Sequence, residues 1–576
     1  MSDPKSVSFL SKKTDELRRV IEACRGYFVT AGVFSLAINL LYLAAPLYML
    51  QVYDRVISSS SEVTLVMLTL ALLIALLALA GLDAVRARVL TRASIRLDRI
   101  LAGRIMSAII EGAQNLGGSR SQLLRDFDTF RQFITGMGIH AIFDLPWAPI
   151  YIAVIFLLHP LLGGFAFGSA VVLICMAFLN ERLVRPSLSE SNEVAARNYN
   201  FTEMSLRNTE VVRAMGMTEG LLRRWGCDRS RMLERQVTAS DRAATMQSII
   251  RFLRLSVQSL ILGLGAYLVI ERDATVGAMF AASILLGRAL QPVEQIVGSW
   301  RNLVAARAAF HRVRELLTAN PPRDLKLELP RPHGRISVEG LSYAPRGSSR
   351  PILRGIGFRL DQGELLGIIG PTGAGKSTLA RHLVGVLAPS AGVVRLDDAD
   401  VSIWPRSLIG QHIGYLPQDI ELFSDTVAAN ICRFQTGTDK AVIDAAQTAG
   451  VHEMILRLPD GYETQVGEGG AILSGGSRQR IGLARAVYGN PSLVVLDEPN
   501  SNLDAEGDAA LTECVVRLKQ RGVAVIIISH RPATIGVVDK ILLMREGMVE
   551  MFGPRAEILA KLTRPVQTVA ARSAAS

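Results

Sequence analysis

Residues 370–378 read GPTGAGKST and directly follow an apolar run, Leu365–Ile369. They fit the pattern G-x-x-x-x-G-K-(S/T), and the flanking residues predict a buried strand before the loop and a helix over Thr378–Val386. Glycines let a backbone curl round a phosphate without Cβ clashes, and the loop N–H groups then face the anion. We therefore expect a phosphate-binding loop made of Gly370, Pro371, Thr372, Gly373, Ala374, Gly375, Lys376, Ser377 and Thr378. Lys376 would reach the β- and γ-phosphates, and the Ser377 hydroxyl would bind Mg²⁺.

The composition indicates a chain that lies partly in a membrane. Of its 576 residues 49% are hydrophobic, and the mean hydropathy of +0.29 is high for a soluble enzyme. This length predicts two to four domains. The net charge of +11 admits a nucleic-acid partner. However, lysine and arginine are dense between residues 85 and 245, beside apolar runs, and positive-inside topology explains this better. We therefore expect a lipid bilayer, and no nucleic acid, as a partner.

Six apolar runs in the first half of the chain predict transmembrane helices. Several approach the ~20 residues that cross a bilayer, although charged residues interrupt the fifth and sixth. A buried helix of a soluble core could explain one such run, but it explains six in half a chain poorly. The runs are Tyr27–Leu50, Val63–Leu82, Ile139–Leu158, Leu161–Leu179, Ser256–Ile270 and Val276–Val297.

The distribution of charge orients these spans. The long segments after the second and fourth runs are rich in arginine, whereas the short connections carry only Arg55 and Arg272 as cations. By the positive-inside rule, the long segments and the N-terminus are cytoplasmic. Each long segment of ~50–70 residues can hold two helices of ~35–50 Å that continue the spans. We expect their turns near Gln114–Ser121 and Asn208–Gly220.

Two residues of the sixth run, Arg288 and Glu294, carry charge in an apolar setting. Charged side chains inside a membrane often line a functional pathway. Near a helix end they can instead reach to the aqueous interface. Both interpretations remain open from the sequence.

Residues 1–25 and the cysteines exclude some classes of protein. The N-terminal residues are polar and lack the apolar core of a signal peptide, so the first span is expected to stay in the protein. The five cysteines are far apart in sequence, with no C-x-x-C pair. They predict neither a disulfide framework nor a zinc site.

A proline-rich stretch, Leu317–Pro332, follows the sixth run and predicts a linker. Beyond it, strand and helix patterns alternate, which predicts an α/β domain. We expect a cytoplasmic N-terminal segment, a six-helix membrane domain, a linker, a nucleotide-binding domain and a tail at residues 1–25, 26–312, 313–333, 334–562 and 563–576.

Acidic residues close a second apolar run of the α/β domain, Ser492–Leu496. Asp497 follows this predicted strand as a carboxylate that helps to hold Mg²⁺ beside a phosphate-binding loop. The adjacent Glu498 is placed to orient or deprotonate an attacking water. A third apolar run, Val523–Ile528, is followed by Ser529 and His530, and this histidine could reach the γ-phosphate or the water from the same edge of the sheet.

Residues 473–476 read LSGG and precede Arg478-Gln479-Arg480. This stretch resembles the signature motif of ATP-binding cassette (ABC) transporters, and the resemblance extends over about residues 20–560. The family implies an ATPase with an α-helical membrane domain and an α/β cassette of the P-loop NTPase class, with ATP and Mg²⁺ as cofactors. One chain with six spans and one cassette is half of such a transporter, so the resemblance implies a homodimer.

The resemblance also implies roles for single residues. Tyr343 looks like the aromatic residue that stacks on adenine, and Gln418 like the glutamine that contacts Mg²⁺ and the attacking water. Glu498 resembles the catalytic base and His530 the switch histidine. Gln465–Gly469 is similar to the X-loop of exporters.

In this family, the signature motif of one cassette completes the nucleotide site of its partner. The residues that would contact nucleotide across such a dimer are Ser474, Gly475, Gly476 and Asp504, the last within a stretch, Ser501–Asp504, that resembles the D-loop. One residue departs from the family pattern, because Ser477 stands where a glutamine is usual. This departure implies lowered or tuned activity, and we still expect two competent sites.

Two membrane stretches narrow the resemblance. Leu41–Arg55 (LYLAAPLYMLQVYDR) and Phe143–Pro149 (FDLPWAP) are similar to the permease/ATPases of type I secretion systems, within the branch that secretes proteases and related proteins. That family works in the bacterial inner membrane with a membrane-fusion adaptor and an outer-membrane channel. It exports proteins that carry an uncleaved C-terminal signal. Some members have an N-terminal peptidase-like domain, which we do not expect before the first span here. An exporter of lipid, drug or small peptide, and an ATP-gated channel or regulator, are the alternatives.

Overall fold

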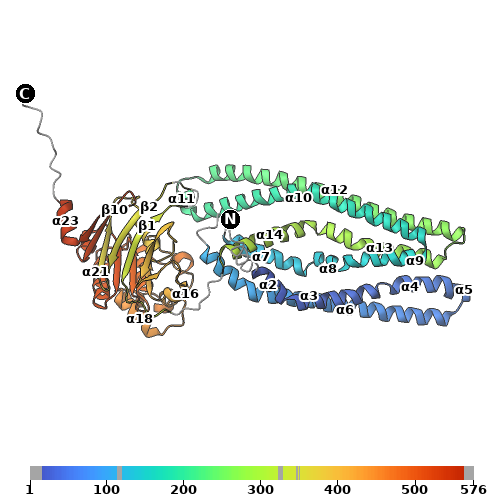
Figure 1. Ribbon diagram of the computed structural model, residues 1–576, viewed down its shortest axis with the longest axis horizontal. Coiled ribbons are helices and arrows are strands. Elements are labelled where there is room, and N and C mark those ends of the chain that lie inside the picture. Colours follow the sequence, from blue (N-terminus) through green and yellow to red (C-terminus); the bar gives the residue numbers. More distant parts are fainter. Residues whose placement is uncertain (1–15, 113–119, 322–328, 346–347, 349, 564–576) are drawn as a thin grey trace, which may run out of the picture. The chain divides into compact units, whose positions relative to one another are not determined.

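Within the part of the chain that the structure describes, six helical segments are long and apolar enough to cross a membrane, which confirms the six predicted spans (Figure 1). The computed structural model describes residues 16–112, 120–321, 329–345, 348 and 350–563, and the chain divides into two units between Pro322 and Arg323. The first unit is helical and the second contains two β-sheets. The predicted fold class is therefore confirmed.

The helices of the first unit include spans that run on far beyond a bilayer's thickness. α6, α10 and α12 contain 50, 48 and 53 residues, or about 75 Å each at 1.5 Å per residue. The helices are α2 Glu16–Ala23, α3 Arg25–Leu41, α4 Ala44–Gln51, the π-helical turn η1 Val52–Val56, α5 Ile57–Ser59, α6 Glu62–Glu111, α7 Arg120–Thr135, α8 Met137–Asp144, the 3-10 turn η2 Leu145–Trp147, α9 Ala148–Leu158, α10 Pro160–Arg207, α11 Thr209–Ala214, α12 Thr218–Ile270, α13 Val276–Gly298 and α14 Trp300–Ala319.

The turns between the long helices were predicted at two places. The short helix α11 lies between α10 and α12, within the range Asn208–Gly220, and α10 and α12 then run side by side (Figure 1). Of the other predicted turn, Gln114–Ser121, residues 114–119 lie outside the described residues. α14 ends at Ala319, inside the stretch 313–333 that the sequence marks as a linker.

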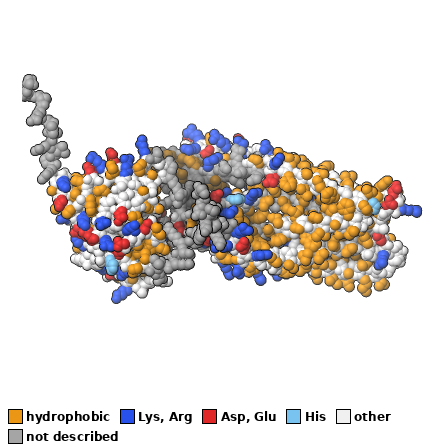
Figure 2. All heavy atoms as spheres, viewed as in Figure 1, with side chains coloured by type: hydrophobic (Ala, Val, Ile, Leu, Met, Phe, Trp, Pro, Cys, Tyr) orange, Lys and Arg blue, Asp and Glu red, His pale blue; other side chains and the backbone are white. Residues whose placement is uncertain are grey.

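The sixth span, α13, is the centre of the first unit. It contacts α4, α8, α9, α10 and α12, and its buried face is made of alanine, leucine, valine and proline side chains. Apolar side chains of the other spans face outward instead, so hydrophobic atoms cover most of the membrane-spanning part on the face seen in Figure 2. This is the pattern expected when the surrounding solvent is hydrocarbon.

Asp54 ties the first span to the start of the sixth. Its carboxylate accepts hydrogen bonds from the Thr275 hydroxyl at 2.7 Å and from the Gly277 backbone N–H at 2.9 Å. These groups lie at the N-terminus of α13, where free N–H donors and the helix dipole favour a negative charge. A Cβ on Gly277 would lie 2.7 Å from this carboxylate, so only glycine allows the approach.

A buried ion pair joins three other helices of the first unit. The guanidinium of Arg86 on α6 bonds to Asp144 at the end of α8 at 3.0 Å, and to Asp83 at 2.8 Å. Asp144 also accepts hydrogen bonds from Ser35 and Asn39 of α3, at 2.5 and 2.8 Å. Because Arg86 is only 4% exposed, these contacts replace the water that its charge would otherwise need.

We expect Arg86→Met to destabilise the protein by about 3–5 kcal/mol, because removing one partner of a buried pair leaves the other charge uncompensated. Thermal unfolding of the purified protein in detergent measures the effect as a lowered Tm. Arg88→Met is the matched control, since Arg88 lies on the same helix but is exposed. Equal melting temperatures for the two variants would contradict a structural role for the ion pair.

The second unit contains a six-stranded sheet in the order β10-β9-β3-β8-β7-β6 and a four-stranded sheet in the order β2-β1-β4-β5. Strands β9, β3, β8, β7 and β6 are parallel, whereas the smaller sheet is antiparallel. The strands are β1 Ile336–Tyr343, β2 Leu353–Leu360, β3 Leu365–Ile369, β4 Ala391–Leu396, β5 Ala399–Asp400, β6 Ile413–Leu416, β7 Leu493–Asp497, β8 Ala524–Ile528, β9 Lys540–Arg545 and β10 Met548–Pro554.

Helices cover this second unit and pack on the strands through two hydrophobic clusters. Strands β7 and β8 are buried at every position, which explains why they read as uninterrupted apolar runs. The helices are α15 Lys376–Leu383, α16 Arg406–Ile409, α17 Val427–Ile431, α18 Asp439–Thr448, α19 His452–Leu456, the 3-10 turns η3 Gly461–Glu463 and η4 Glu468–Gly470, α20 Gly475–Val487, α21 Ala505–Gln520, α22 Pro532–Ile535 and α23 Arg555–Thr563.

Candidate nucleotide site

Three neighbouring parallel strands carry the predicted site residues at their carboxyl ends. β3 pairs with β8, and β8 pairs with β7. Gly370 follows β3, Glu498 follows β7, and His530 comes two residues after β8. Parallel strands end at one edge of a sheet, so the loop, the carboxylates and the histidine lie at the same edge. This is where open α/β sheets bind ligands.

The phosphate-binding loop has the backbone that its glycines predict. Gly370, Gly373 and Gly375 have positive φ angles of 153°, 83° and 93°. A Cβ on Gly370 would collide with the Met544 carbonyl, and one on Gly375 would lie 2.8 Å from Leu353 Cδ2. Only glycine fits both positions, and α15 begins directly afterwards at Lys376. The helix N-terminus therefore points its free N–H groups into the loop.

Lys376 is buried within this loop. Its ammonium donates hydrogen bonds to the carbonyls of Gly370 at 2.7 Å and Pro371 at 3.1 Å. Burial lowers the pKa of Lys376, and the carboxylates of Glu498 and Asp497 act against that shift. The lysine thus holds the loop in shape and sets a positive charge beside the two acids.

The Ser377 hydroxyl and Asp497 are in direct contact. Ser377 Oγ donates to Asp497 Oδ1 at 3.2 Å, and Asp497 is only 2% exposed. Burial raises the pKa of Asp497, while the hydrogen bond from Ser377 lowers it. Hydroxyl and carboxylate oxygens are hard ligands that suit Mg²⁺. The donor set therefore fits the cation, with Gln418 able to add an amide oxygen.

Gln418 and Glu498 meet at the exposed mouth of the site. Gln418 Nε2 donates to Glu498 Oε2 at 3.0 Å, across two segments that are 80 residues apart. Glu498 has a φ angle of +50°, which a non-glycine residue adopts at a cost of roughly 1 kcal/mol or more. Its backbone N–H donates to the Ile528 carbonyl at 3.0 Å, which holds this conformation. His530, two residues after the end of β8, is exposed.

Two buried amides support these catalytic candidates, and sequence reasoning assigned neither of them a role. Gln479 on α20 donates to the backbone carbonyl of Glu498 at 3.3 Å and accepts from the Asn502 N–H at 3.2 Å. Asn500 accepts from Ser529 Oγ at 3.1 Å and donates to Thr534 Oγ1 at 3.0 Å. The segment after β7 is therefore held to α20 and to the segment after β8. An amide pattern in sequence gives no sign of such long-range partners.

The LSGG stretch forms the start of α20. Ser474 is the N-cap residue, and its hydroxyl accepts from the Ser477 N–H at 3.1 Å. The Ser477 hydroxyl lies 2.8 Å from the Ser474 hydroxyl, so the unusual residue at position 477 bonds to the serine of the motif. A Cβ on Gly476 would lie 2.9 Å from the Asn502 carbonyl. Ser474, Gly475 and Gly476 thus lie at a helix N-terminus next to the D-loop-like stretch.

Asp504 and Tyr343 have clear partners within the chain. Asp504 is the N-cap of α21, with its Oδ1 accepting from the Gly507 N–H at 2.8 Å. The Tyr343 ring packs edge-on against His382 of α15, with the ring centroids 4.7 Å apart. Tyr343 therefore lies beside the helix that follows the phosphate loop. Contact of either residue with nucleotide stays a prediction.

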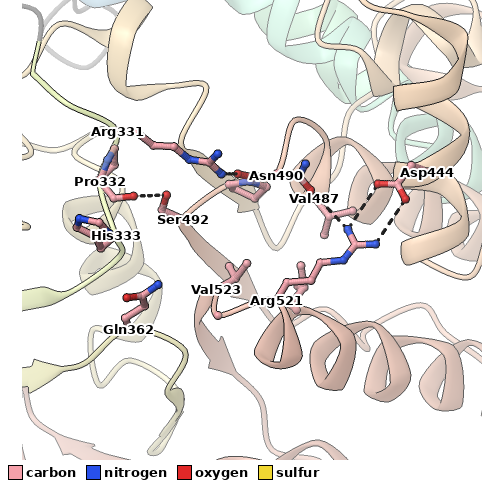
Figure 3. A pocket seen from close by; sticks show the side chains of 13 residues that line it. Arg331, Pro332, His333, Gln362, Asp444, Val487, Asn490, Ser492, Arg521 and Val523 are labelled. Carbon is pink, nitrogen blue, oxygen red and sulfur yellow. Dashed lines mark hydrogen bonds and ion pairs between the residues drawn. The ribbon is translucent and has the colours of Figure 1, made fainter.

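One cavity of this unit lies away from the phosphate loop. It has a volume of about 750 Å³ and lies at the amino ends of β7 and β8, the edge opposite to the phosphate loop (Figure 3). Arg331 donates there to the Asn490 carbonyl at 2.8 Å, and the Ser492 hydroxyl donates to the Pro332 carbonyl at 2.6 Å. These bonds fasten the entering chain to the sheet. We assign the site by its chemistry and not by the size of the cavity.

Comparison with known proteins agrees with this arrangement. Residues 28–293 match the model of the ABC transporter transmembrane region, and residues 353–501 match the ABC transporter family model. The structure of a bacterial Atm1-family ABC exporter with ATP bound is similar, with a TM-score of 0.82, 22% identity and coverage of 93% of this chain and 96% of the other. At that identity the likeness establishes the fold.

Several known proteins have a higher sequence identity to this chain than that structure has. The chain is 43% identical over 547 residues to the type I secretion system ATP-binding protein PrsD of Rhizobium meliloti (strain 1021), covering 94% of both chains. It is 30% identical to the leukotoxin translocation ATP-binding protein LktB of Mannheimia haemolytica, covering 93% of this chain and 76% of the other. The toxin RTX-I translocation ATP-binding protein of Actinobacillus pleuropneumoniae is 29% identical, with 93% and 77% covered.

The chain has an ATP-binding domain, and its helical unit makes it a multi-pass membrane protein. The two family models and the identity to PrsD over nearly the whole chain agree with the geometry of the phosphate loop and of the carboxylates. The chain is therefore an ATPase that belongs to the ABC transporters and, among them, to the type I secretion system ATP-binding proteins.

Proposed function

We propose that this chain drives the export of a polypeptide across the bacterial inner membrane by hydrolysing ATP, as the energising component of a type I secretion system. The identity of 43% over 94% of both chains to a type I secretion system protein carries this proposal. Two further relatives are named for the translocation of toxins. The cargo would pass unfolded and would carry a C-terminal secretion signal, as the family resemblance implies.

The partners follow from the same proposal. We propose a membrane-fusion adaptor and an outer-membrane channel, with the N-terminus and the cassette in the cytoplasm. The membrane domain would cover residues 26–312 and the nucleotide-binding domain residues 334–562, joined by the linker 313–333. The arginine-rich long segments between spans support the orientation.

We propose that two copies of the chain form the working transporter. The motif at Ser474–Gly476 lies at the N-terminus of α20, and Ser474 is exposed. Free N–H groups at such a helix end favour an anion. In the homodimer this helix end would close on the nucleotide held by the phosphate loop of the other copy, so that ATP would bias the equilibrium between an open and a closed dimer.

Each residue of the site then has a task in hydrolysis. Lys376 and the loop N–H groups would bind the β- and γ-phosphates, and His530 would contact the γ-phosphate. Glu498 would accept the proton of the attacking water, and Gln418, which bonds to Glu498, would help to orient that water. Ser377, Asp497 and Gln418 would hold Mg²⁺, which neutralises phosphate charge when bound.

We expect Glu498→Gln to lower ATP turnover by about 10²-fold or more, since glutamine cannot accept the proton from water. Nucleotide binding should persist, because the phosphate loop is unchanged. Steady-state phosphate release and binding of a fluorescent ATP analogue measure the two properties separately. Glu506→Gln, an exposed carboxylate change on α21, is the control. Turnover like that of the control would contradict the assignment of Glu498 as base.

Asp497→Asn should stabilise the nucleotide-free cassette at pH 7. Burial raises the pKa of Asp497 in the folded chain, so its charged form weakens the fold at pH values above the ordinary carboxyl pKa. We expect the cassette's melting transition to rise by on the order of 2 °C, with the gain fading as pH falls towards about 4.

In the same variant, Mg²⁺ should no longer add to the stabilisation that ATP alone gives, because the amide is neutral and has one oxygen fewer than the carboxylate. Asp361→Asn, at an exposed turn, should change neither property. A melting transition of Asp497→Asn that still rises when Mg²⁺ is added to ATP would argue against Asp497 as a metal ligand.

Deleting the gene tests export itself. We expect specific proteins to disappear from the culture medium, and to return with the wild-type gene but not with Lys376→Ala. A peptide from the C-terminus of such a protein should change the ATPase rate of the purified transporter. Unchanged secretion, together with an ATPase that responds only to lipids, would favour an exporter of lipid or drug.

A further inference from the structure

The central membrane helix α13 has a polar face as well as its buried apolar face. Polar or small residues recur at helical spacing along it and are only partly buried: Gly287, Arg288, Gln291, Glu294 and Gln295. Residues three and four apart lie on one side of a helix. A polar stripe of this kind is costly against lipid, so it must face water or another polar surface.

The outer surfaces of the other spans differ from this stripe. On α6 the exposed side chains of the span include Leu70, Leu73 and Leu77, and on α10 they include Phe167 and Phe178. Hydrophobic atoms dominate this part of the molecule in Figure 2 as well. Lipid therefore has an apolar surface to contact elsewhere, and the stripe on α13 is not part of it.

Two cavities lie along the stripe. One of about 340 Å³ is lined by Gly287, Glu294 and, from α12, Arg254 and Gln258. The other, of about 180 Å³, is lined by the ion-pair residues Asp83, Arg86 and Asp144. Arg288 and Gln291 line both, so the two cavities are neighbours along the stripe. Polar cavities of this size hold several water molecules.

The charges around these two cavities are balanced. Arg254 pairs with Glu294 at 2.6 Å, and Arg86 pairs with Asp83 and Asp144. Arg288 lies over the Tyr42 ring, 3.9 Å from its centroid, and donates to Gln291 at 3.1 Å. Three arginines thus face three carboxylates across the two cavities. Such a lining repels neither acidic nor basic segments of a bound molecule.

We propose that this groove, formed by Gln258, Gly287, Arg288, Gln291 and Glu294, binds the backbone of the cargo polypeptide in extended form. The inference rests on the proposed export function and names the contact surface for its substrate. Side-chain amides both donate and accept hydrogen bonds. Gln258 and Gln291 can therefore pair with the N–H and C=O groups that every residue of a cargo presents, whatever its sequence.

The dimensions of the groove match this occupant. From Gly287 to Glu294, α13 rises about 10 Å at 1.5 Å per residue, the length of about three residues of extended chain. Gly287 has no side chain, and a Cβ added to it would lie 3.3 Å from Gln258 Nε2. A larger residue would displace that amide. A lipid or an apolar drug would instead leave these polar groups unpaired, at a cost.

Thiol labelling tests whether the groove holds water. In a variant with the five native cysteines replaced, Gln258→Cys and Gln291→Cys should react with a membrane-impermeant maleimide at least tenfold faster than Leu260→Cys. Leu260 is the matched control, because it lies on α12 two residues from Gln258 and is 59% exposed on the apolar surface. Equal slow labelling at all three positions would overturn the aqueous groove.

Photocrosslinking then tests the occupant. A photoreactive amino acid is placed at position 291, or at position 260 as the control. The cargo is a secreted protein whose export is lost in the deletion strain. It is fused to a stable folded domain, which stalls it during export. We expect a crosslink to cargo at 291 and not at 260. Dependent export with no crosslink at 291 would overturn the groove but not the proposed function, whereas absence of any dependent secreted protein would overturn the proposed function first. A crosslink between two copies of the chain at 291 would assign the stripe to the dimer interface and also overturn the proposal.

Discussion

The interior of a bilayer offers no water to polar groups, and this constraint explains most of the first unit. Two polar side chains of the helices illustrate this: Arg86 pairs with Asp144, and Asp54 bonds to the N-terminus of α13. Each pair joins helices that are far apart in sequence. The apolar surface alone could not select these neighbours, because lipid solvates leucine as well as another leucine does. Polar pairing therefore sets which helices meet.

The cassette depends on a different constraint, the common edge at which adjacent parallel strands end. Once β3 lies between β9 and β8, and β8 beside β7, the phosphate loop, Asp497 and His530 come to one edge without further adjustment. Fine positions are then set by buried amides. Gln479 and Asn500 hold the loop after β7 and so hold Glu498, whose backbone conformation is unfavourable by itself. The unfavourable φ of Glu498 is thus maintained by bonds from neighbouring segments.

The two membrane stretches that resemble type I secretion proteins gain a physical explanation. Asp54 lies in Leu41–Arg55, and Asp144 lies in Phe143–Pro149. Both carboxylates are structural centres that connect spans, one at α13 and one at α6 and α3. In this structure, both stretches therefore contribute to how the spans pack. The polar stripe of α13 lies beside both stretches, because Arg288 lies over the Tyr42 ring and Asp144 lines the cavity of about 180 Å³.

The sequence by itself determined the elements and their chemistry. Apolar length predicted six spans, and β3 was predicted over its observed residues, Leu365–Ile369. The phosphate loop was predictable because its glycines, lysine and serine are contiguous and act through local backbone geometry. The acids after β7 were predictable because they end an apolar strand.

Only the tertiary structure decided what joins residues far apart in the chain. It brought Gln418 to Glu498, Arg86 to Asp144, and Gln258 and Gln291 to one groove. It also showed that Ser477 bonds to Ser474, and that Asp504 caps α21. Such contacts depend on strand order and helix packing, which arise from many weak interactions across the whole fold. No local pattern of residues records them.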